Sequence, residues 1–227
     1  MASRMVLYFP NATACVAIIR THHLPTPITT VSMAEPCKDL SNGWEAMAKD
    51  YHNQRRWQIG ADVIQTFTQD LQAGQSVLDL GCGCGGPHIQ QLLDRSIDVY
   101  AIDAAPTMIA QFRQRFPTAK ACCEAAEHSN FYQMKFDAML LIGFIFLLAA
   151  DTQRHLLTSL ALSLHQGGRI LFSSPAQVCQ WPDVSTGLMS ISLGKAAYIA
   201  IFRQLDMTLR DEYTDAGGNH YFCFVKS

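Results

Sequence analysis

Hydrophobic and polar positions follow two different rhythms along the chain, and these rhythms predict strands and helices in turn. Short aliphatic and β-branched runs indicate strands, whereas apolar residues at helical spacing indicate the helices between them. The expected strands are Ser76–Leu80, Asp98–Ile102, Ala119–Cys123, Phe136–Ile142 and Arg169–Ser173. Their alternation with helices predicts a single α/β domain with a Rossmann-like, doubly wound sheet, mostly parallel, and with helices on both faces.

The pattern changes on either side of this alternating region. Before it, apolar residues at helical spacing predict a helix over 42–60, as part of a helical lid spanning residues 33–75. After it, Met207–Tyr213 and Tyr221–Val225 are separated by only seven residues, which is too short for a helical crossover. We therefore expect a core over residues 76–227 whose sheet ends in an antiparallel C-terminal hairpin.

The first part of the chain has a different character. Residues 1–32 contain no acidic residue, and Pro10 and Asn11 interrupt their apolar run. Met33 opens the sequence Met-Ala-Glu-Pro, which is typical of a natural start. We expect residues 1–32 to be a disordered extension; their two arginines also suit a weak targeting peptide, although no clean cleavage site follows the apolar run.

Composition narrows the classes of partner. Hydrophobic residues make up 49% of the 227, enough for one sizeable core, and the net charge of −2 gives no general attraction to a phosphate backbone. No run of residues has the apolar length needed to cross a bilayer. The eight cysteines lack the spacing of a zinc or redox site, which favours buried free thiols in a reducing compartment. We expect a cytoplasmic monomer or homodimer with no metal and no nucleic-acid or membrane partner.

A glycine-rich loop follows the first expected strand. Residues 77–86 read Val-Leu-Asp-Leu-Gly-Cys-Gly-Cys-Gly-Gly. Glycines after a strand let the backbone turn sharply and approach a ligand closely. Gly81, Gly83 and Gly86 fit the G-x-G-x-x-G fingerprint, and Asp103 closes the next strand, where an acid would hold a ribose. The loop alone therefore suits an NAD(P)-binding protein as well as an enzyme with a smaller nucleoside cofactor.

Asp79 separates these two interpretations. It lies two residues before Gly81, where its carboxylate can accept hydrogen bonds from glycine-loop amides or from an ammonium group on a cofactor. A dinucleotide loop seats a pyrophosphate at the helix N-terminus, and a carboxylate so close would repel that anion. NAD enzymes also generally need a further domain for the substrate. Both features favour a nucleoside cofactor that carries an amino acid and no pyrophosphate.

Taken in order, the motifs resemble those of class I S-adenosylmethionine-dependent methyltransferases of the short bacterial, small-molecule type. The motifs are Val77–Gly83, Asp103, Cys123-Glu124-Ala125, the fourth strand Phe136–Leu141, and the turn Leu164–Arg169. The resemblance covers about residues 42–226, and one departure is the pair Cys82 and Cys84 in the loop. It implies S-adenosylmethionine as cofactor and direct SN2 methyl transfer, in which the cofactor supplies the activation.

The resemblance also implies a cofactor site. Asp103 is expected to hold both ribose hydroxyls, and Glu124 or Ala125 to contact the adenine. Met108 can pack on the adenine face, although a core methionine is equally ordinary. The full expected set is Tyr51, Arg55, Asp79, Gly81, Cys82, Gly83, Asp103, Ala104, Met108, Glu124, Ala125 and Ile142.

Two residues of that set belong to the expected lid. Tyr51 and Arg55 lie four residues apart, which places them on one helical face. There they can cover the methionyl end of the cofactor and pair with its carboxylate. Arg56 is the rival to Arg55 for this role.

The acceptor is expected to be a small molecule. The residues 141–144 read Leu-Ile-Gly-Phe and lack the signatures of amino-methylating and cytosine C5 enzymes, and no acid for an arginine methyltransferase occurs between Asp137 and Asp151. Proteins of this fold can also be non-catalytic scaffolds. The intact glycines and acids argue against that alternative here.

The long stretch 174–193 is where we expect the acceptor, since long ordered loops at the carboxyl edge of such a sheet are usually functional. The expected acceptor wall is Phe144, Trp181 and Tyr213. Asp183 and His220 are the two candidates for a catalytic base. For each of them a purely structural role is the more common outcome.

Overall fold

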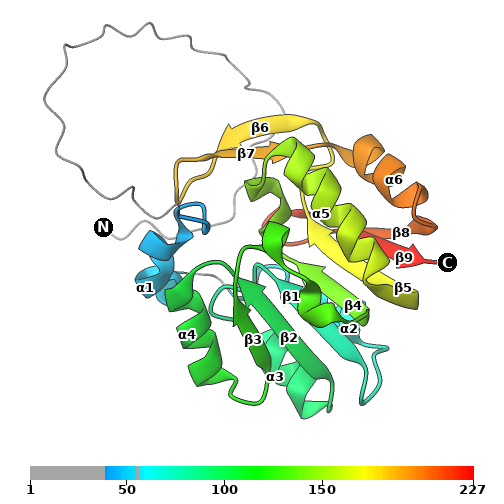
Figure 1. The fold of residues 1–227 in the computed structure, drawn as a ribbon. Coiled ribbons are helices and arrows are strands. Elements are labelled where there is room, and N and C mark those ends of the chain that lie inside the picture. The colour runs from blue at the N-terminus through cyan, green and yellow to red at the C-terminus, as the bar shows by residue number, and fades with distance from the viewer. Residues whose placement is uncertain (1–38, 55–56) are drawn as a thin grey trace, which may run out of the picture.

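The computed structural model describes residues 39–54 and 57–227, which build one α/β domain (Figure 1). Its main sheet has seven strands in the order β3-β2-β1-β4-β5-β9-β8. The strands are β1 (Ser76–Leu80), β2 (Asp98–Asp103), β3 (Lys120–Cys123), β4 (Phe136–Leu141), β5 (Leu164–Ser173), β8 (Met207–Thr214) and β9 (His220–Lys226). Strands β1 to β5 pair in parallel and β9 pairs antiparallel with both neighbours, so the predicted fold class and C-terminal hairpin are confirmed.

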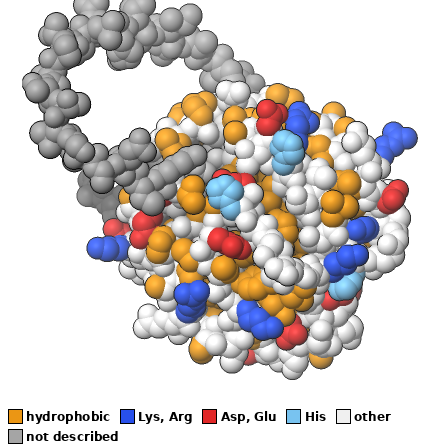
Figure 2. Space-filling model, in the orientation of Figure 1, with side chains coloured by type: hydrophobic (Ala, Val, Ile, Leu, Met, Phe, Trp, Pro, Cys, Tyr) orange, Lys and Arg blue, Asp and Glu red, His pale blue; other side chains and the backbone are white. Residues whose placement is uncertain are grey.

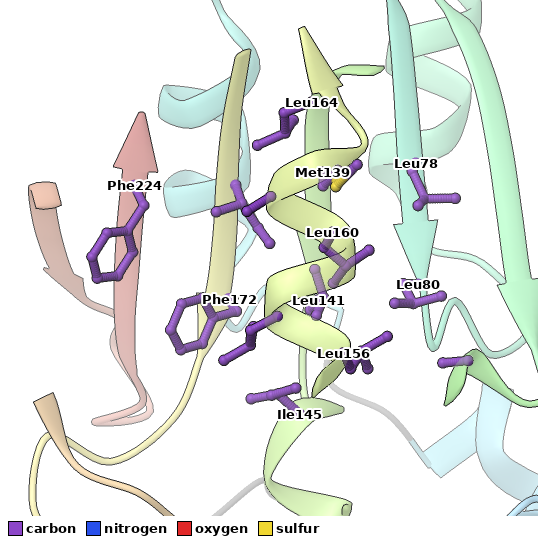
Figure 3. Close-up of a cluster of buried hydrophobic side chains, with 14 of the residues drawn as sticks. Leu78, Leu80, Met139, Leu141, Ile145, Leu156, Leu160, Leu164, Phe172 and Phe224 are labelled. Atoms are coloured by element: carbon purple, nitrogen blue, oxygen red, sulfur yellow. The ribbon is translucent and has the colours of Figure 1, made fainter. Parts of the chain in front are cut away.

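Helices cover both faces of this sheet. The helices are α1 (Trp44–Gln54), α2 (Ala61–Thr68), α3 (Pro87–Asp94), α4 (Pro106–Arg115), α5 (Ala150–Leu162) and α6 (Lys195–Arg203). Apolar residues of α2, α3 and α4 pack with one set of strand side chains, and those of α5 and α6 with the alternate set. Figure 3 shows Leu156 and Leu160 of α5 among strand residues of the same cluster, which include Leu80, Met139 and Leu141.

The central strands are buried on both faces. All of β1 is buried, and β4 is buried except for Asp137, which accepts hydrogen bonds from Ser76. The continuous apolar run of β4 is typical of a strand in mid-sheet. Because β1, β2 and β4 pair in parallel, the residues that follow them meet at one edge of the sheet. That carboxyl edge is where an α/β sheet binds its ligand.

Two expectations about local structure are wrong. The helix expected over 42–60 ends at Gln54, and α2 begins only after Gly60, which has a left-handed φ of 77°. A Cβ at Gly60 would lie 2.4 Å from the Tyr221 hydroxyl, so tertiary contact with β9 fixes this break. The expected long loop over 174–193 contains a two-stranded antiparallel ribbon, β6 (Cys179–Pro182) and β7 (Met189–Ser192).

The predictions for residues 1–32 and for Arg55 and Arg56 fall outside the described residues. Within the described part, no helix has the length and apolar character of a membrane span. Three short 3-10 helices complete the part of the fold that the structure describes, and two of them, η1 and η3, contribute residues to the site. They are η1 (Ala126–His128), η2 (Phe131–Gln133) and η3 (Ile145–Leu147).

Candidate functional site

A cleft that encloses about 720 Å³ lies at the carboxyl edge of the sheet. Its floor is formed by the residues that follow β1, β2, β3 and β4, and its cover by α1 with the turn before it. Nine of the twelve residues expected to bind a cofactor line it, together with Phe144. They are Tyr51, Gly81, Gly83, Asp103, Ala104, Met108, Glu124, Ala125 and Ile142.

The glycine loop presents bare backbone to the cleft. Gly81 and Gly83 have left-handed φ angles of 71° and 55°, which favour glycine. A Cβ at Gly81 would lie 2.5 Å from the ring of Phe144, so no side chain fits at this position. The amides of Gly81 and Cys82 both donate to the carbonyl of Ile102, at 2.8 and 3.2 Å, and these bonds fasten the loop to the end of β2.

Asp103 is held at the centre of the cleft floor. One carboxylate oxygen accepts the amide of Gly83 and the other accepts the amide of Ala105, both at 2.8 Å. The second bond also fixes the approach to α4, whose first residue is Pro106. Burial raises the pKa of the Asp103 carboxyl, and the two amide bonds oppose that shift. Each oxygen retains a lone pair that can accept a hydroxyl, so the group suits a ribose diol.

Asp79 does not accept a glycine-loop amide, and that part of its expected role is wrong. Its carboxylate is buried behind the loop, and Oδ2 lies 3.2 Å from Nε2 of His88 on α3. The loop amides of residues 81–83 already bond to Ile102 and Asp103. Asp79 is absent from the cleft lining as well, and its contact with His88 joins the end of β1 to α3.

Cys82 is likewise turned away from the cleft lining. Its thiol contacts the carbonyl of Gly83 at 3.4 Å. Burial raises its pKa well above the ordinary range, and the carboxylates of Asp103 and Asp79 add to the shift. The thiol therefore stays protonated and fills space under the loop.

Two acids stand at the end of the cleft that follows β3. Glu124 accepts a short 2.5 Å hydrogen bond from the Ser129 hydroxyl, and its amide donates to the carbonyl of Asp103 at 3.0 Å. Glu127 also lines the cleft and was not expected from the sequence. It lies in η1, which begins two residues after Glu124, and the periodicity of the chain gives no signal for it. Met108 is buried beside Gly83, as a packing surface within the same cleft.

Helix α1 covers the glycine loop. Glu45 accepts the amide and hydroxyl of Thr107 at 3.0 and 2.5 Å, which docks the start of α1 on the start of α4. Tyr51 faces the loop, with its ring 3.4 Å from the Cβ position of Gly83. The ring of Trp44 meets Tyr51 edge-on with centroids 5.5 Å apart, and Trp44 also lines the cleft.

The other side of the cleft is apolar. Phe144, Leu147 and Leu148 follow β4 and line it opposite Trp44. This wall is fixed at its base, because the amide of Gly143 donates to the Ser173 hydroxyl at 2.7 Å. The sequence indicated Phe144 but not the two leucines, which lie in an apolar run that gives no sign of which residues face inward.

Trp181 and Asp183 lie in the β6–β7 ribbon and do not line the cleft. The Trp181 ring is buried against Phe146, with centroids 5.3 Å apart. The buried Asp183 carboxylate accepts the amides of Ser185 and Thr186 at 3.0 and 2.8 Å, and so closes the turn of the ribbon. These contacts give Trp181 a core position and Asp183 a turn-stabilising one, in place of the expected contact with an acceptor.

Tyr213 and His220 lie on the β8–β9 hairpin, and neither lines the cleft. Tyr213 pairs across the strands with Tyr221, and burial raises its pKa. Nε2 of His220 lies 3.0 Å from Glu212 Oε1, and Glu212 also pairs with Lys195. Tyr213 therefore does not join the wall of this cleft, and His220 is not placed in it as a base.

Among residues 39–54 and 57–227, no group of three or more His, Cys, Asp or Glu side chains is placed to hold a metal ion. The ligand-binding features that these residues do bring together are a bare glycine loop, a pinned strand-end carboxylate and an apolar wall. They define the site of a Rossmann-like protein that binds a nucleoside.

The chain is similar to known methyltransferases. Residues 77–168 match a family model described as a methyltransferase domain. No curated protein matches the chain. The chain is therefore similar to methyltransferase domains over residues 77–168, and it has the Rossmann-like fold described above.

Solved methyltransferases share the fold at low sequence identity. A TehB-like S-adenosylmethionine-dependent methyltransferase from Corynebacterium glutamicum superposes with a TM-score of 0.60 and 18% identity, over 80% of this chain and 99% of that one. The 1,6-didemethyltoxoflavin-N1-methyltransferase of Burkholderia thailandensis, with bound S-adenosylhomocysteine, gives 0.63 and 17%, over 86% and 93%. The magnesium protoporphyrin IX methyltransferase of Synechocystis, with bound S-adenosylmethionine, gives 0.59 and 14%, over 83% and 82%.

Proposed function

We propose that the chain methylates a small, neutral and largely apolar acceptor in this cleft, with S-adenosylmethionine as the methyl donor. The observation that carries the proposal is the Asp103 carboxylate, which lies partly buried beside the glycine loop with one amide donor on each oxygen. A ribose needs such an acceptor pair, and the apolar wall beyond Phe144 supplies a place for a second molecule.

The residues present fit the cofactor. A Cβ at Gly81 would strike Phe144, and Gly83 has a left-handed φ of 55°, so both positions of the cradle favour glycine. The residues that would hold the cofactor are Tyr51, Gly81, Gly83, Asp103, Ala104, Met108, Glu124, Ala125 and Ile142. When bound, S-adenosylmethionine supplies a methyl group activated by its sulfonium, so the protein mainly has to align the reactants and exclude water.

The acceptor half of the cleft is assigned to four residues. Trp44, Phe144, Leu147 and Leu148 replace the ribbon and hairpin residues of the initial expectation. An apolar wall suits a hydrophobic or aromatic acceptor and removes water from the reacting atoms. Glu124 and Glu127 line the same cleft and disfavour an acceptor with a carboxylate or phosphate.

The distribution of charge on the surface also supports a small-molecule acceptor. On the face drawn in Figure 2, acidic, basic and histidine side chains are interspersed among hydrophobic ones. Together with the net charge of −2, this mixture supports a small-molecule acceptor over a nucleic acid. The proposal includes a cytoplasmic location and a monomer or homodimer.

A thermal-shift titration tests the proposed cofactor against the two alternatives. S-adenosylhomocysteine should raise the melting temperature in a concentration-dependent way, since a ligand at 100 times its Kd adds about 2.7 kcal/mol of stability. NAD should leave it unchanged. A shift with NAD alone would indicate a dinucleotide-binding protein, and no shift with either compound would indicate a non-catalytic scaffold.

A further inference from the structure

Exposed apolar side chains lie on the turn before α1 and on the β6–β7 ribbon. Leu40 is 40% exposed and also lines the cleft, the turn that joins β6 to β7 carries Val184 and Leu188 at 68% and 51% exposure, and Met189 at the start of β7 is 54% exposed. We call these four residues the mouth patch. Contiguous exposed apolar surface on a soluble domain usually marks a binding site.

The turn of the ribbon lies against the turn that precedes α1, as Figure 1 shows at the left ends of β6 and β7. The Cβ position of Gly43 is 3.5 Å from the Thr186 methyl group and 3.9 Å from a methyl group of Leu188. Asp39 stabilises the turn before α1 by accepting hydrogen bonds from the amides of Ser41 and Gly43, both at 2.9 Å. Leu40 and Leu188 are therefore carried by two touching turns at the same end of the cleft.

The ribbon is also fastened to the inner wall of the cleft. The buried side-chain amide of Gln153 donates to the carbonyls of Leu148 and Ile191, both at 2.9 Å. Leu148 lines the cleft and Ile191 belongs to β7. Because one side chain holds both backbones, the apolar wall inside the cleft and the ribbon outside it form a single fixed surface.

We propose that the acceptor is an amphipathic molecule whose neutral reactive end enters the cleft and whose hydrocarbon portion extends over the mouth patch. This inference rests on the proposed function. Its basis is that Leu40, Leu147 and Leu148 line one cleft, and that the turn carrying Leu40 touches the ribbon turn carrying Leu188. Each methylene that the patch covers should strengthen binding about fourfold, equivalent to about 0.8 kcal/mol.

The test measures the binding of 4-ethylphenol, 4-butylphenol and 4-hexylphenol to the full chain in saturating S-adenosylhomocysteine. These probes are neutral at pH 7 and differ only in chain length. Calorimetry should show affinity rising about three- to fourfold per added methylene across the series. Titration of S-adenosylhomocysteine alone comes first, so that a failure of the proposed cofactor site is seen separately from a failure of the mouth patch.

Leu188→Ser should abolish the gain from 4-butylphenol to 4-hexylphenol and leave 4-ethylphenol within twofold of the unaltered chain. Leu162→Ser is the matched control, because Leu162 is 60% exposed at the end of α5, away from the cleft lining. That variant should retain the full chain-length dependence. Val184→Ser provides a second patch variant with the same expected result.

Three outcomes would overturn the inference. The first is an affinity that does not depend on chain length, or no binding by any of the three probes. The second is an equal loss in Leu188→Ser and Leu162→Ser. The third is a change of oligomeric state: sedimentation velocity shows that Leu188→Ser converts a dimer to a monomer, while the affinities for the three phenols stay unchanged. The mouth patch would then be a contact between copies of the chain.

Discussion

Replacing Asp103 by asparagine tests the residue on which cofactor recognition depends. Each carboxylate oxygen accepts one amide at 2.8 Å and has a further lone pair for a ribose hydroxyl. Asparagine keeps the shape but presents an NH2 group in place of one oxygen, so one hydroxyl loses its charged acceptor. Hydrogen bonds to charged groups contribute about 1.5–3 kcal/mol, which corresponds to a roughly 10- to 150-fold weaker Kd for S-adenosylhomocysteine.

The assay is isothermal titration calorimetry, with the melting temperature of each ligand-free variant recorded alongside. The new NH2 group would also face the amide of Gly83 or Ala105, so some loss of stability is expected without ligand. Asp98→Asn is the matched control, since Asp98 is exposed at the opposite end of β2. A Kd within twofold of the unaltered chain in both variants would refute the reasoning.

The remaining predictions concern pH, the glycine loop, the ribbon and the N-terminus. Burial raises the pKa of Asp103 above the ordinary 3.8, and the ionised carboxylate is the form that binds the ribose. The affinity for S-adenosylhomocysteine, measured by calorimetry, should therefore fall as the pH drops toward and through the raised pKa. Asp103→Asn should remove this pH dependence. Gly81→Ala should weaken cofactor binding more than tenfold by calorimetry, which corresponds to roughly 1.4 kcal/mol, because the new methyl group would clash with Phe144. Gly187 has the same φ of 71° but open space around it, so Gly187→Ala should leave cofactor binding unchanged. Trp181→Ala should lower the unfolding free energy by about 3–5 kcal/mol in urea titrations and leave the S-adenosylhomocysteine Kd within a few-fold, because the ring packs on Phe146. A chain that begins at Met33 should keep its melting temperature and cofactor affinity; a loss of several degrees would show that residues 1–32 pack on the domain.

Elements with a strong local pattern were predictable from the sequence. The run Phe136–Ile142 is apolar at nearly every position, and β4 does lie in mid-sheet as Phe136–Leu141. The sequence placed a helix boundary at Gly60, where α2 does begin, but it did not predict that α1 ends as early as Gln54. The ribbon in 174–193 was missed because its strands are only four residues each, too short for their alternation to stand out within the long connection.

The cofactor half of the site could likewise be predicted from local sequence order, whereas the acceptor half could not. Asp103 ends β2 and Glu124 directly follows β3, and parallel strands bring their carboxyl ends to one edge, so local order was enough to place both residues beside the glycine loop. Trp181 and Asp183 were assigned from their position in a long connection, and His220 from its chemistry at the start of the last strand. Their actual contacts depend on how the ribbon and hairpin pack, and nothing in the local sequence encodes that packing.

A crystal structure with S-adenosylhomocysteine is the most direct test of the account. The ribose hydroxyls should lie within hydrogen-bond distance of both Asp103 oxygens, with the adenine between Glu124 and Met108 and the sulfur directed toward Phe144. Density for the ligand outside this cleft, or a ribose that contacts another acid, would contradict the central claim.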